Sequence, residues 1–493
     1  MFLSKNISIF IKKYHKNTFK KCIRFISGNV EEWKPTIGLE IHAQISTKSK
    51  LFSGAPTNFN NPINSCVSLF DCAIPGTMPV KYNKYFRKAG FQITQQKKPL
   101  AINGKIKFNV FKTGVHKQPY SKSSKIKQIQ LEQDSGKSLH NEGVGRSLID
   151  LNRAGIPLME LVFEPDLTSG EEAAALVKEL CFILQLLGTC SCKMEEGALR
   201  VDANVSISKP NAPLGIRTEL KNISSLSAIN HAIEYEIKRQ ISILQKGGEI
   251  INETRAWDPL SKKTVLMREK EEKHDYRFMP EPNLPPLHLY VNRNVQNTYD
   301  LIDIPALKEQ LPELPEQIRQ NLLKSLTPDT LAAITSDLEW YLLFCDILKN
   351  GNHREPQLVA KIFISEILSL LNKYNLDFTF CINNQEYIEE LIDLIQAKII
   401  NQPTFKKLLN ELLNKPNKMP KQIVEENNWF IISNEKELEM ICLEILKTNP
   451  NLVKQYKAGR KKVFKKFLHK TFLLTEQRAD MAKTSKIMTR LLS

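Results

Sequence analysis

The sequence predicts an α+β protein whose amino-terminal part combines strands with helices and whose carboxyl-terminal part is entirely helical. Before about residue 300, several segments alternate apolar and polar residues with the period of a strand. From about Pro305 onward, apolar residues recur at three- and four-residue spacing, which is typical of amphipathic helices. The chain has 493 residues, enough for two or three packed domains. We therefore place a domain boundary near residue 300.

The first 30 residues have the composition of a mitochondrial targeting sequence. They contain seven Lys or Arg residues interleaved with Phe, Ile and Tyr, and no acidic residue occurs before Glu31. We interpret residues 1–30 as a mitochondrial transit peptide, which predicts a location in the mitochondrial matrix. A basic arm that stays on the mature protein is the alternative.

Cysteine usage and hydropathy exclude two classes of protein. The nine cysteines include no CxxC pair, so their spacing supports neither a disulfide framework nor a structural zinc site, and a reducing compartment fits best. No stretch approaches the roughly eighteen uninterrupted apolar residues of a membrane-spanning helix. We therefore predict no membrane span.

The amino-terminal strands are predicted to have one chemically active face. In residues 37–45 and 199–207, strict alternation separates apolar residues from acids, bases and amides. Residues 158–162 and 217–221 show the same separation. An ordinary half-exposed sheet also alternates, and for any single strand that alternative is equally good. The polar positions are Glu40, His42, Glu160, Arg200, Asp202, Arg217, Glu219 and Lys221.

A sheet lined with carboxylates and cations suits a metal and nucleotide site. Acids hold a divalent ion, and Arg or Lys binds phosphoryl oxygens. A P-loop is excluded because Gly136-Lys137-Ser138 lacks the required earlier glycine, which is replaced by Leu131. Any ATP must therefore bind in another kind of site.

Capping and periodicity locate the helices. Residues 168–188 begin with capping-box spacing from Thr168 and Ser169 and end at Gly188, and residues 225–247 form a second helix. Further helices are predicted at residues 314–326, 329–348, 356–374, 385–400 and 435–447.

Residues 454–470 form a second basic segment. It contains eight Lys or Arg residues and no acid, with Tyr456, Phe464 and Phe467 at helix-like spacing. Such a segment can bind an RNA backbone by neutralising phosphates. A solvated helix face is an equally good explanation on charge alone.

Several motifs resemble those of the B subunits of the aspartyl/glutamyl-tRNA(Asn/Gln) amidotransferases, mitochondrial form. The similarity runs in order from about residue 36 to the carboxyl terminus. The motifs are Ile37-Gly-Leu-Glu-Ile-His42, Leu131-Glu-Gln-Asp-Ser-Gly-Lys137, Asp150-Leu-Asn-Arg-Ala-Gly155, Met194-Glu-Glu-Gly197, Arg200-Val-Asp-Ala-Asn204, Arg217-Thr-Glu-Leu-Lys-Asn222, Glu253-Thr-Arg255, His274-Asp-Tyr-Arg277 and Tyr456-Lys-Ala-Gly459.

The resemblance implies three domains after the transit peptide. Residues 34–300 would form a catalytic cradle around an antiparallel sheet similar to the glutamine synthetase catalytic fold. Residues 301–395 would form a helical domain, and residues 396–493 a helical tail that binds tRNA. The tail residues expected to contact tRNA are Lys457, Arg460, Lys461, Lys465 and Lys466.

The resemblance also implies the site residues. His42, Glu132 and Glu160 would bind Mg²⁺. Catalytic contacts are expected from Glu40, Arg200, Asp202, Arg217, Glu219 and Lys221, and ATP contacts from Arg255, Arg268 and Arg277.

The implied activity is that of a glutamine-hydrolysing carbon–nitrogen ligase. Such a transamidase converts misacylated Glu-tRNA(Gln) to Gln-tRNA(Gln) in mitochondria. A glutamate side chain is a poor electrophile, so ATP first converts it to a γ-glutamyl phosphate, which ammonia then attacks. The ammonia comes from glutamine through an amidase-type A subunit, and a small C subunit completes the heterotrimer.

Two departures from the family pattern stand out. Where many bacterial relatives carry zinc-binding CxC and CxxC pairs, this chain has Ser53-Gly54-Ala55 and the separated Cys66 and Cys72, so no zinc is expected. The stretch after Asn83 is shorter than in the family, so either the chain has lost part of the cradle or the sequence derives from an incomplete gene model. A catalytically impaired tRNA-binding or assembly subunit of the same complex is therefore the alternative. A third alternative is a free-standing ligase of the glutamine synthetase type, which would join ammonia to free glutamate without tRNA. Such an enzyme would give the basic tail no purpose.

Overall fold

The computed structural model describes residues 33–73, 94–111, 116, 118–141, 146–269, 287–291, 296–351, 353–414 and 418–492. The chain forms two compact units, Met1–Glu316 and Gln317–Ser493. The predicted transit peptide and most of the shortened stretch after Asn83 lie outside the described residues.

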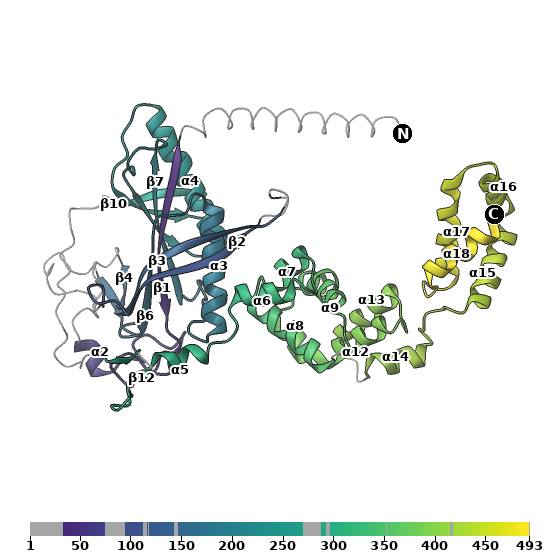
Figure 1. Ribbon diagram of the computed structural model, residues 1–493, viewed down its shortest axis with the longest axis horizontal. Coiled ribbons are helices and arrows are strands. Elements are labelled where there is room, and N and C mark those ends of the chain that lie inside the picture. Colours follow the sequence, from purple (N-terminus) through teal and green to yellow (C-terminus); the bar gives the residue numbers. More distant parts are fainter. Residues whose placement is uncertain are drawn as a thin grey trace. The chain divides into compact units, whose positions relative to one another are not determined.

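An eight-stranded sheet forms the centre of the first unit (Figure 1). Its strand order is β10-β9-β8-β7-β1-β6-β3-β2, and all neighbours pair antiparallel except β8 and β9, which are parallel. The predicted antiparallel sheet is therefore present, with one parallel pair. The strands are β1 (Lys34–Gln44), β2 (Ala101–Val110), β3 (Tyr120–Gln133), β6 (Pro157–Phe163), β7 (Leu199–Ser208), β8 (Thr218–Ile223), β9 (Glu253–Asp258) and β10 (Lys263–Glu269).

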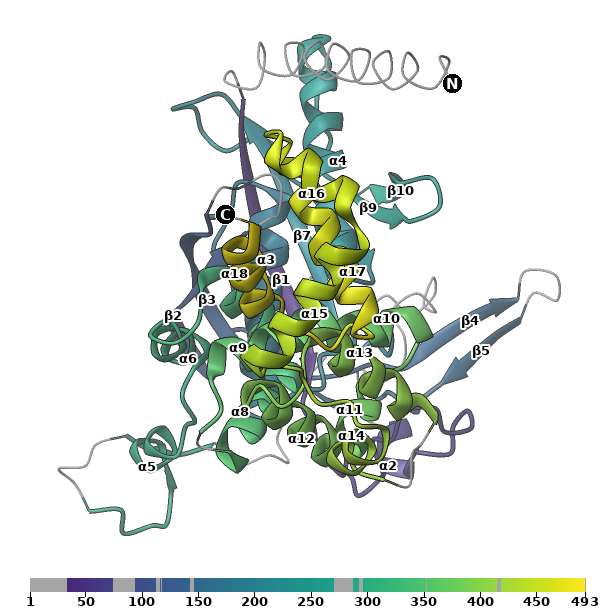
Figure 2. The same ribbon diagram turned by 90° about the vertical axis from the view of Figure 1, so that its right-hand side faces the viewer.

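Smaller elements complete the first unit. Strands β4 (Lys137–Asn141) and β5 (Arg146–Asp150) form an antiparallel ladder that extends away from the main sheet (Figure 2). Strands β11 (Leu289–Tyr290) and β12 (Ile302–Asp303) form a short parallel pair. The short helices of this part of the chain are α2 (Leu69–Ala73) and α5 (Ile304–Glu309).

Two long helices cover one face of the sheet. They are α3 (Gly170–Leu186) and α4 (Leu226–Gln245), which confirms the helices predicted at residues 168–188 and 225–247. Each begins at a serine whose hydroxyl accepts a backbone hydrogen bond: Ser169 from Glu172 at 3.2 Å and Ser225 from Ala228 at 3.1 Å. Such caps satisfy amide groups that the first helical turn leaves without partners.

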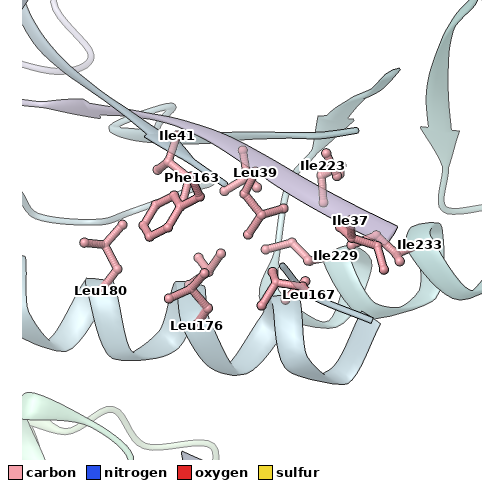
Figure 3. Close-up of a cluster of buried hydrophobic side chains, with 14 of the residues drawn as sticks. Ile37, Leu39, Ile41, Phe163, Leu167, Leu176, Leu180, Ile223, Ile229 and Ile233 are labelled. Carbon is pink, nitrogen blue, oxygen red and sulfur yellow. The ribbon is translucent and has the colours of Figure 1, made fainter. Parts of the chain in front are cut away.

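The core of the first unit lies between the sheet and these helices. Figure 3 shows Leu39 and Ile41 of β1 on the side of Leu176 and Leu180 of α3, and Ile37 beside Ile229 of α4, all of them buried. The alternate apolar residues of β7 face the same cluster. The predicted alternation is thus confirmed for β1 and β7, and it leaves their polar side chains on the opposite face of the sheet.

The second unit is helical, as the periodicity predicts. The segment predicted as one helix at residues 329–348 is two helices separated by a break at Thr335 to Asp337. Asp337 caps the second of them through the amide of Glu339, so the chain restarts a helix there. The helices are α6 (Pro315–Leu322), which begins in the first unit, α7 (Pro328–Ile334), α8 (Leu338–Asn350), α9 (Pro356–Ile362), π-helix η2 (Phe363–Ile367), α10 (Leu368–Tyr374), α11 (Thr379–Asn383), α12 (Gln385–Gln396), α13 (Gln402–Glu411), 3₁₀-helix η3 (Leu412–Asn414), α14 (Pro420–Asn427), α15 (Glu435–Thr448), α16 (Pro450–Lys457), 3₁₀-helix η4 (Lys461–Val463), α17 (Phe464–Leu474) and α18 (Met481–Leu492).

Two hydrophobic clusters organise these helices. One extends from Leu326 to Val424 and the other from Leu438 to Leu492. The sequence-based boundary between helical and tail domains, at residues 395 and 396, falls inside the first cluster, because Leu391 of α12 and Phe405 of α13 belong to it together. In the part of the chain that the structure describes, no helix is long and apolar enough to cross a membrane.

Candidate active site

The face of the sheet opposite α3 and α4 carries a row of polar side chains. In the strand ladders, His42 of β1 lies opposite Glu160 of β6 and opposite Arg200 of β7, and Glu160 lies opposite Gln130 of β3. Residues opposite one another in an antiparallel ladder project from the same face. Four strands that are distant in sequence therefore contribute to one row.

Three of these side chains converge on a common point. Nε2 of His42 lies 3.3 Å from Oε2 of Glu132 and 3.8 Å from Oε1 of Glu160. One ligand atom from each residue lies within 4.8 Å of the others. The Glu132 carboxylate is 6% exposed and that of Glu160 is 14% exposed, so water screens their charges poorly. The three predicted metal ligands thus lie together.

The two buried carboxylates repel each other when both are ionised, so their pKa values are shifted in opposite directions. Burial and the neighbouring Glu132 carboxylate raise the pKa of Glu160 to about 8. Burial also opposes ionisation of Glu132, but hydrogen bonds from His42 and Glu160 outweigh it and lower its pKa to about 2. For His42, burial lowers the pKa, yet the Glu132 hydrogen bond and the Glu160 charge raise it overall. The cluster therefore favours a positive charge between its acids.

Gln130 is a member of this group that sequence reasoning missed. It is 2% exposed, and its side-chain nitrogen donates to Oε1 of Glu132 at 3.2 Å and to Oε2 of Glu160 at 2.6 Å. Its position two residues before Glu132 in a strand places both on one face, which is the signal that could have found it.

A pocket of about 450 Å³ adjoins the cluster. Arg200, one of its cations, donates to Oδ2 of the buried Asp134 at 2.7 Å, and the same oxygen lies 3.2 Å from Nε of Arg153. Asp134 therefore fixes two arginines at once. The residues that line the pocket are His42, Asp134, Ser135, Met194, Leu199, Arg200, Val201, Asp202, Lys221, Asn222, Ile223 and Ser224.

Lys221 is the second cation of the pocket. Its ammonium group donates to Asp202 and lies 3.5 Å from Glu219, whose other oxygen accepts from Thr254 at 2.9 Å. Burial lowers the pKa of Lys221, but the charges of Asp202 and Glu219 outweigh it and raise the pKa, which keeps this side chain cationic.

Glu40 and Arg217 complete the predicted catalytic set. Glu40 accepts from the side-chain amide of Asn204 at 3.1 Å and lies opposite Asp202 in the ladder between β1 and β7. Arg217 is exposed and immediately precedes β8.

The structure does not bring Arg255 to this pocket. Its guanidinium donates to Glu253 and Thr264 and lies 3.8 Å from Glu236 of α4, so it faces the helices. The reason is the register of β9 on β8, which puts Arg255 opposite the core residue Leu220 and so on the same face of the sheet. Arg268 lies in β10, where its backbone pairs with Thr254. Arg277 lies outside the described residues.

The five basic residues predicted to bind tRNA are all exposed, and they run from the last residue of α16 into the first turn of α17. The aromatic residues of the basic segment face inward: Phe467 is fully buried, and Tyr456 and Phe464 pack against the same cluster. These rings are therefore core residues, and the exposed surface of the segment is basic. The five residues are Lys457, Arg460, Lys461, Lys465 and Lys466.

Two protein families match most of this sequence. The family described as GatB/GatE catalytic domain matches residues 35–89 and 85–294, and the one described as GatB domain matches residues 342–492. The two parts of the first match overlap at residues 85–89, shortly after Asn83.

Relatives match nearly the whole chain. It is 46% identical to an Aedes aegypti protein named as the mitochondrial B subunit of glutamyl-tRNA(Gln) amidotransferase, over 93% of both chains. The human protein of that name is 39% identical, over 94% of this chain and 89% of its own. A Rickettsia canadensis protein, named as the B subunit of aspartyl/glutamyl-tRNA(Asn/Gln) amidotransferase, is 36% identical, over 92% of this chain and 97% of its own. The chain therefore belongs to the family of glutamyl-tRNA(Gln) amidotransferase B subunits.

Proposed function

We propose that this protein is the subunit of a mitochondrial transamidase that activates the glutamate of Glu-tRNA(Gln) for conversion to glutamine. The observation that carries the proposal is the convergence of His42, Glu132 and Glu160 beside a pocket containing Arg200 and Lys221. The names of the relatives supply the substrate and the location: the mosquito and human proteins are both named as mitochondrial and as acting on Glu-tRNA(Gln).

The cluster fits a hard divalent cation, and we assign it to Mg²⁺. Two carboxylates and an imidazole supply a site in which the acids repel one another, in keeping with the raised pKa of Glu160. The bound ion would supply positive charge to the phosphoryl group of ATP during its transfer. Further ligands would come from water and phosphate oxygens, as is usual for Mg²⁺.

The cations of the pocket have separate tasks. Arg200 binds phosphoryl oxygens, and Asp134 holds its guanidinium in one orientation. Lys221 binds the same group of oxygens as a point charge that Asp202 and Glu219 keep protonated. In this assignment the residues position ATP and the glutamate, while the attacking nitrogen comes from ammonia. The product of phosphoryl transfer is a γ-glutamyl phosphate, whose phosphate is released when ammonia attacks.

The remaining assignments belong to the same proposal. The first unit corresponds to a cradle of the glutamine synthetase type, and an amidase-type A subunit supplies ammonia from glutamine, with a small C subunit joining the two. The exposed residues from Lys457 to Lys466 contact the tRNA backbone. The shortened stretch after Asn83 supports the second candidate, an impaired subunit that holds tRNA without catalysing the reaction.

The test is transamidation with ammonium chloride as the nitrogen donor, which removes the dependence on glutamine hydrolysis. The reconstituted complex should convert Glu-tRNA(Gln) to Gln-tRNA(Gln) with ATP, and Glu132→Gln should lower the rate at least about 100-fold. The matched control is Glu249→Gln, an exposed carboxylate between α4 and β9.

Two outcomes decide between the candidates. Equal rates for Glu132→Gln and the unmodified protein would remove the metal assignment. A complex that binds Glu-tRNA(Gln) but hydrolyses no ATP and forms no Gln-tRNA(Gln) would favour the impaired subunit.

A further inference from the structure

Gln130 divides the oxygens of the two candidate metal-binding carboxylates into two sets. Its amide nitrogen donates to Oε1 of Glu132 at 3.2 Å and to Oε2 of Glu160 at 2.6 Å. The other two oxygens, Oε2 of Glu132 and Oε1 of Glu160, are the ones that face Nε2 of His42. One side chain therefore binds the outer oxygen of each acid and leaves the inner oxygens directed to a common point.

The orientation of this amide is itself fixed. Gln130 is 2% exposed, its nitrogen also reaches Oγ1 of Thr94 at 2.9 Å, and its carbonyl oxygen accepts from the side-chain nitrogen of Gln128. Its backbone pairs with Glu160 in the ladder between β3 and β6. Rotation of the amide would place its oxygen against two carboxylates, which electrostatic repulsion opposes.

An amide suits this position for a physical reason. Two buried carboxylates require donors, because each carboxylate without a partner loses hydration. A lysine or arginine would satisfy them but would also neutralise their charge and compete with a metal ion. The glutamine side chain supplies N–H donors without a formal charge, so the acids remain available to a cation.

We propose that Gln130 is a positioning residue that aims the inner oxygens of Glu132 and Glu160 at the metal ion, and that it sets the affinity of the site for that ion. This inference rests on the proposed function, since it deepens the assignment of the same cluster. Groups that orient metal ligands in this way typically change metal affinity 10- to 100-fold when removed.

The test is binding of Mn²⁺ alone, measured by electron paramagnetic resonance on the full chain, with competition by Mg²⁺. Gln130→Met keeps the length of the side chain and removes the donors, and the Mn²⁺ affinity should fall about 10- to 100-fold. The matched control is Gln133→Met on the same strand: Gln133 is buried, and its side-chain nitrogen and oxygen make no hydrogen bond among the described residues. This control should leave the affinity unchanged.

Steady-state transamidation gives a second measurement. Gln130→Met should raise the Mg²⁺ concentration needed for half-maximal rate, while saturating Mg²⁺ should restore kcat to near the unmodified value. A merely structural role would lower the amount of active protein and would not shift the Mg²⁺ requirement. If Gln130→Met does not fold, Gln130→Asn, whose shorter amide cannot reach both acids, should give the same shift.

The outcomes separate the inference from the proposed function. Unchanged or tighter Mn²⁺ binding by folded Gln130→Met, together with lost binding by Glu132→Gln, overturns the role of Gln130 alone. Unchanged Mn²⁺ binding by Glu132→Gln overturns the metal site, and with it the inference. Weaker binding by both variants, with Gln133→Met unaffected, supports the proposal.

Discussion

Replacing Arg255 by methionine should destabilise the fold without weakening ATP binding. Arg255 lies in a charged network on the helical side of the sheet, where its Nη1 donates to Glu253 at 2.9 Å and its Nη2 to the backbone oxygen of Thr264 at 2.7 Å. Glu236, also in the network, is fully buried. Loss of Arg255 would leave these acceptors short of donors in a region that water does not reach.

The magnitude follows from the remaining contacts. Removing one partner of a buried ion pair costs about 3–5 kcal/mol. Arg239 still donates to Glu236 at 2.7 Å and to Glu253 at 2.9 Å, so part of the charge stays compensated. We therefore expect a loss of about 2–3 kcal/mol in the free energy of unfolding of the first unit. Since about 1.4 kcal/mol corresponds to a factor of ten, amide exchange should accelerate about 30- to 150-fold.

Hydrogen exchange with mass spectrometry is the suitable assay, because it reports on β9, β10 and α4 separately from the second unit. ATP affinity is measured on the same samples. The paired control is Arg217→Met, an exposed arginine for which the opposite result is expected: weaker nucleotide or substrate binding with unchanged exchange. Normal exchange together with a lowered ATP affinity in Arg255→Met would refute the reasoning and return Arg255 to the nucleotide site.

Three further predictions concern stability and RNA binding. Burial raises the pKa of Glu172, but its bonds to Lys122 and Thr168 lower it below the ordinary 4.5. Ionised Glu172 therefore stabilises the protein above pH 4.5, and this contribution is lost as the pH falls through the lower folded-state pKa. Denaturant titrations should show the deficit of Glu172→Gln shrinking at acid pH; a pH-independent deficit would contradict this. Gly170→Ala should lower the free energy of unfolding by about 1–3 kcal/mol, because the added carbon would lie 2.5 Å from the backbone oxygen of Asn230. Gly54→Ala, with no neighbouring atom within 4 Å, is its control in thermal melting, and equal melting temperatures would refute the packing argument. Alanine at the five tail positions should weaken tRNA binding. The slope of the logarithm of the binding constant against the logarithm of the salt concentration should become shallower by roughly 0.7–0.9 per lost phosphate contact. Unchanged affinity would indicate a solvated helix face. These positions are Lys457, Arg460, Lys461, Lys465 and Lys466.

The sequence predicts the active face well where strands alternate regularly. In β1 and β7 the apolar residues are buried, so His42 and Arg200 had to share the other face. Alternation alone does not establish which strands are neighbours. It also did not identify Glu132, which was predicted from the resemblance to a family. The convergence of Glu132 and Glu160 on His42 depends on β6 pairing with both β1 and β3, a long-range contact without a local signal.

The assignments that differ from the structure have physical causes. Arg255 belongs to a family motif, but its register opposite the buried Leu220 puts it on the helical side of the sheet, and that register leaves no local signal in the sequence. The apolar spacing of residues 329–348 continues without interruption, so it predicts one helix. The break is caused by Asp337, which caps a new helix, and a polar cap does not change the spacing of the apolar residues. Gln130 carries no charge, so a search for acids and bases passes over it.

Strand β1 contributes alternate side chains to the hydrophobic core on one face of the sheet and to the candidate site on the other face. Deleting a single residue between Lys34 and Ile41 would shift the phase of everything that follows by one position. Ile41 would then enter the row of acids, and His42 would face Leu176 and Leu180. Such a deletion would disrupt the core and separate the residues of the proposed metal site, so insertions and deletions should be tolerated far less in this strand than substitutions on either face.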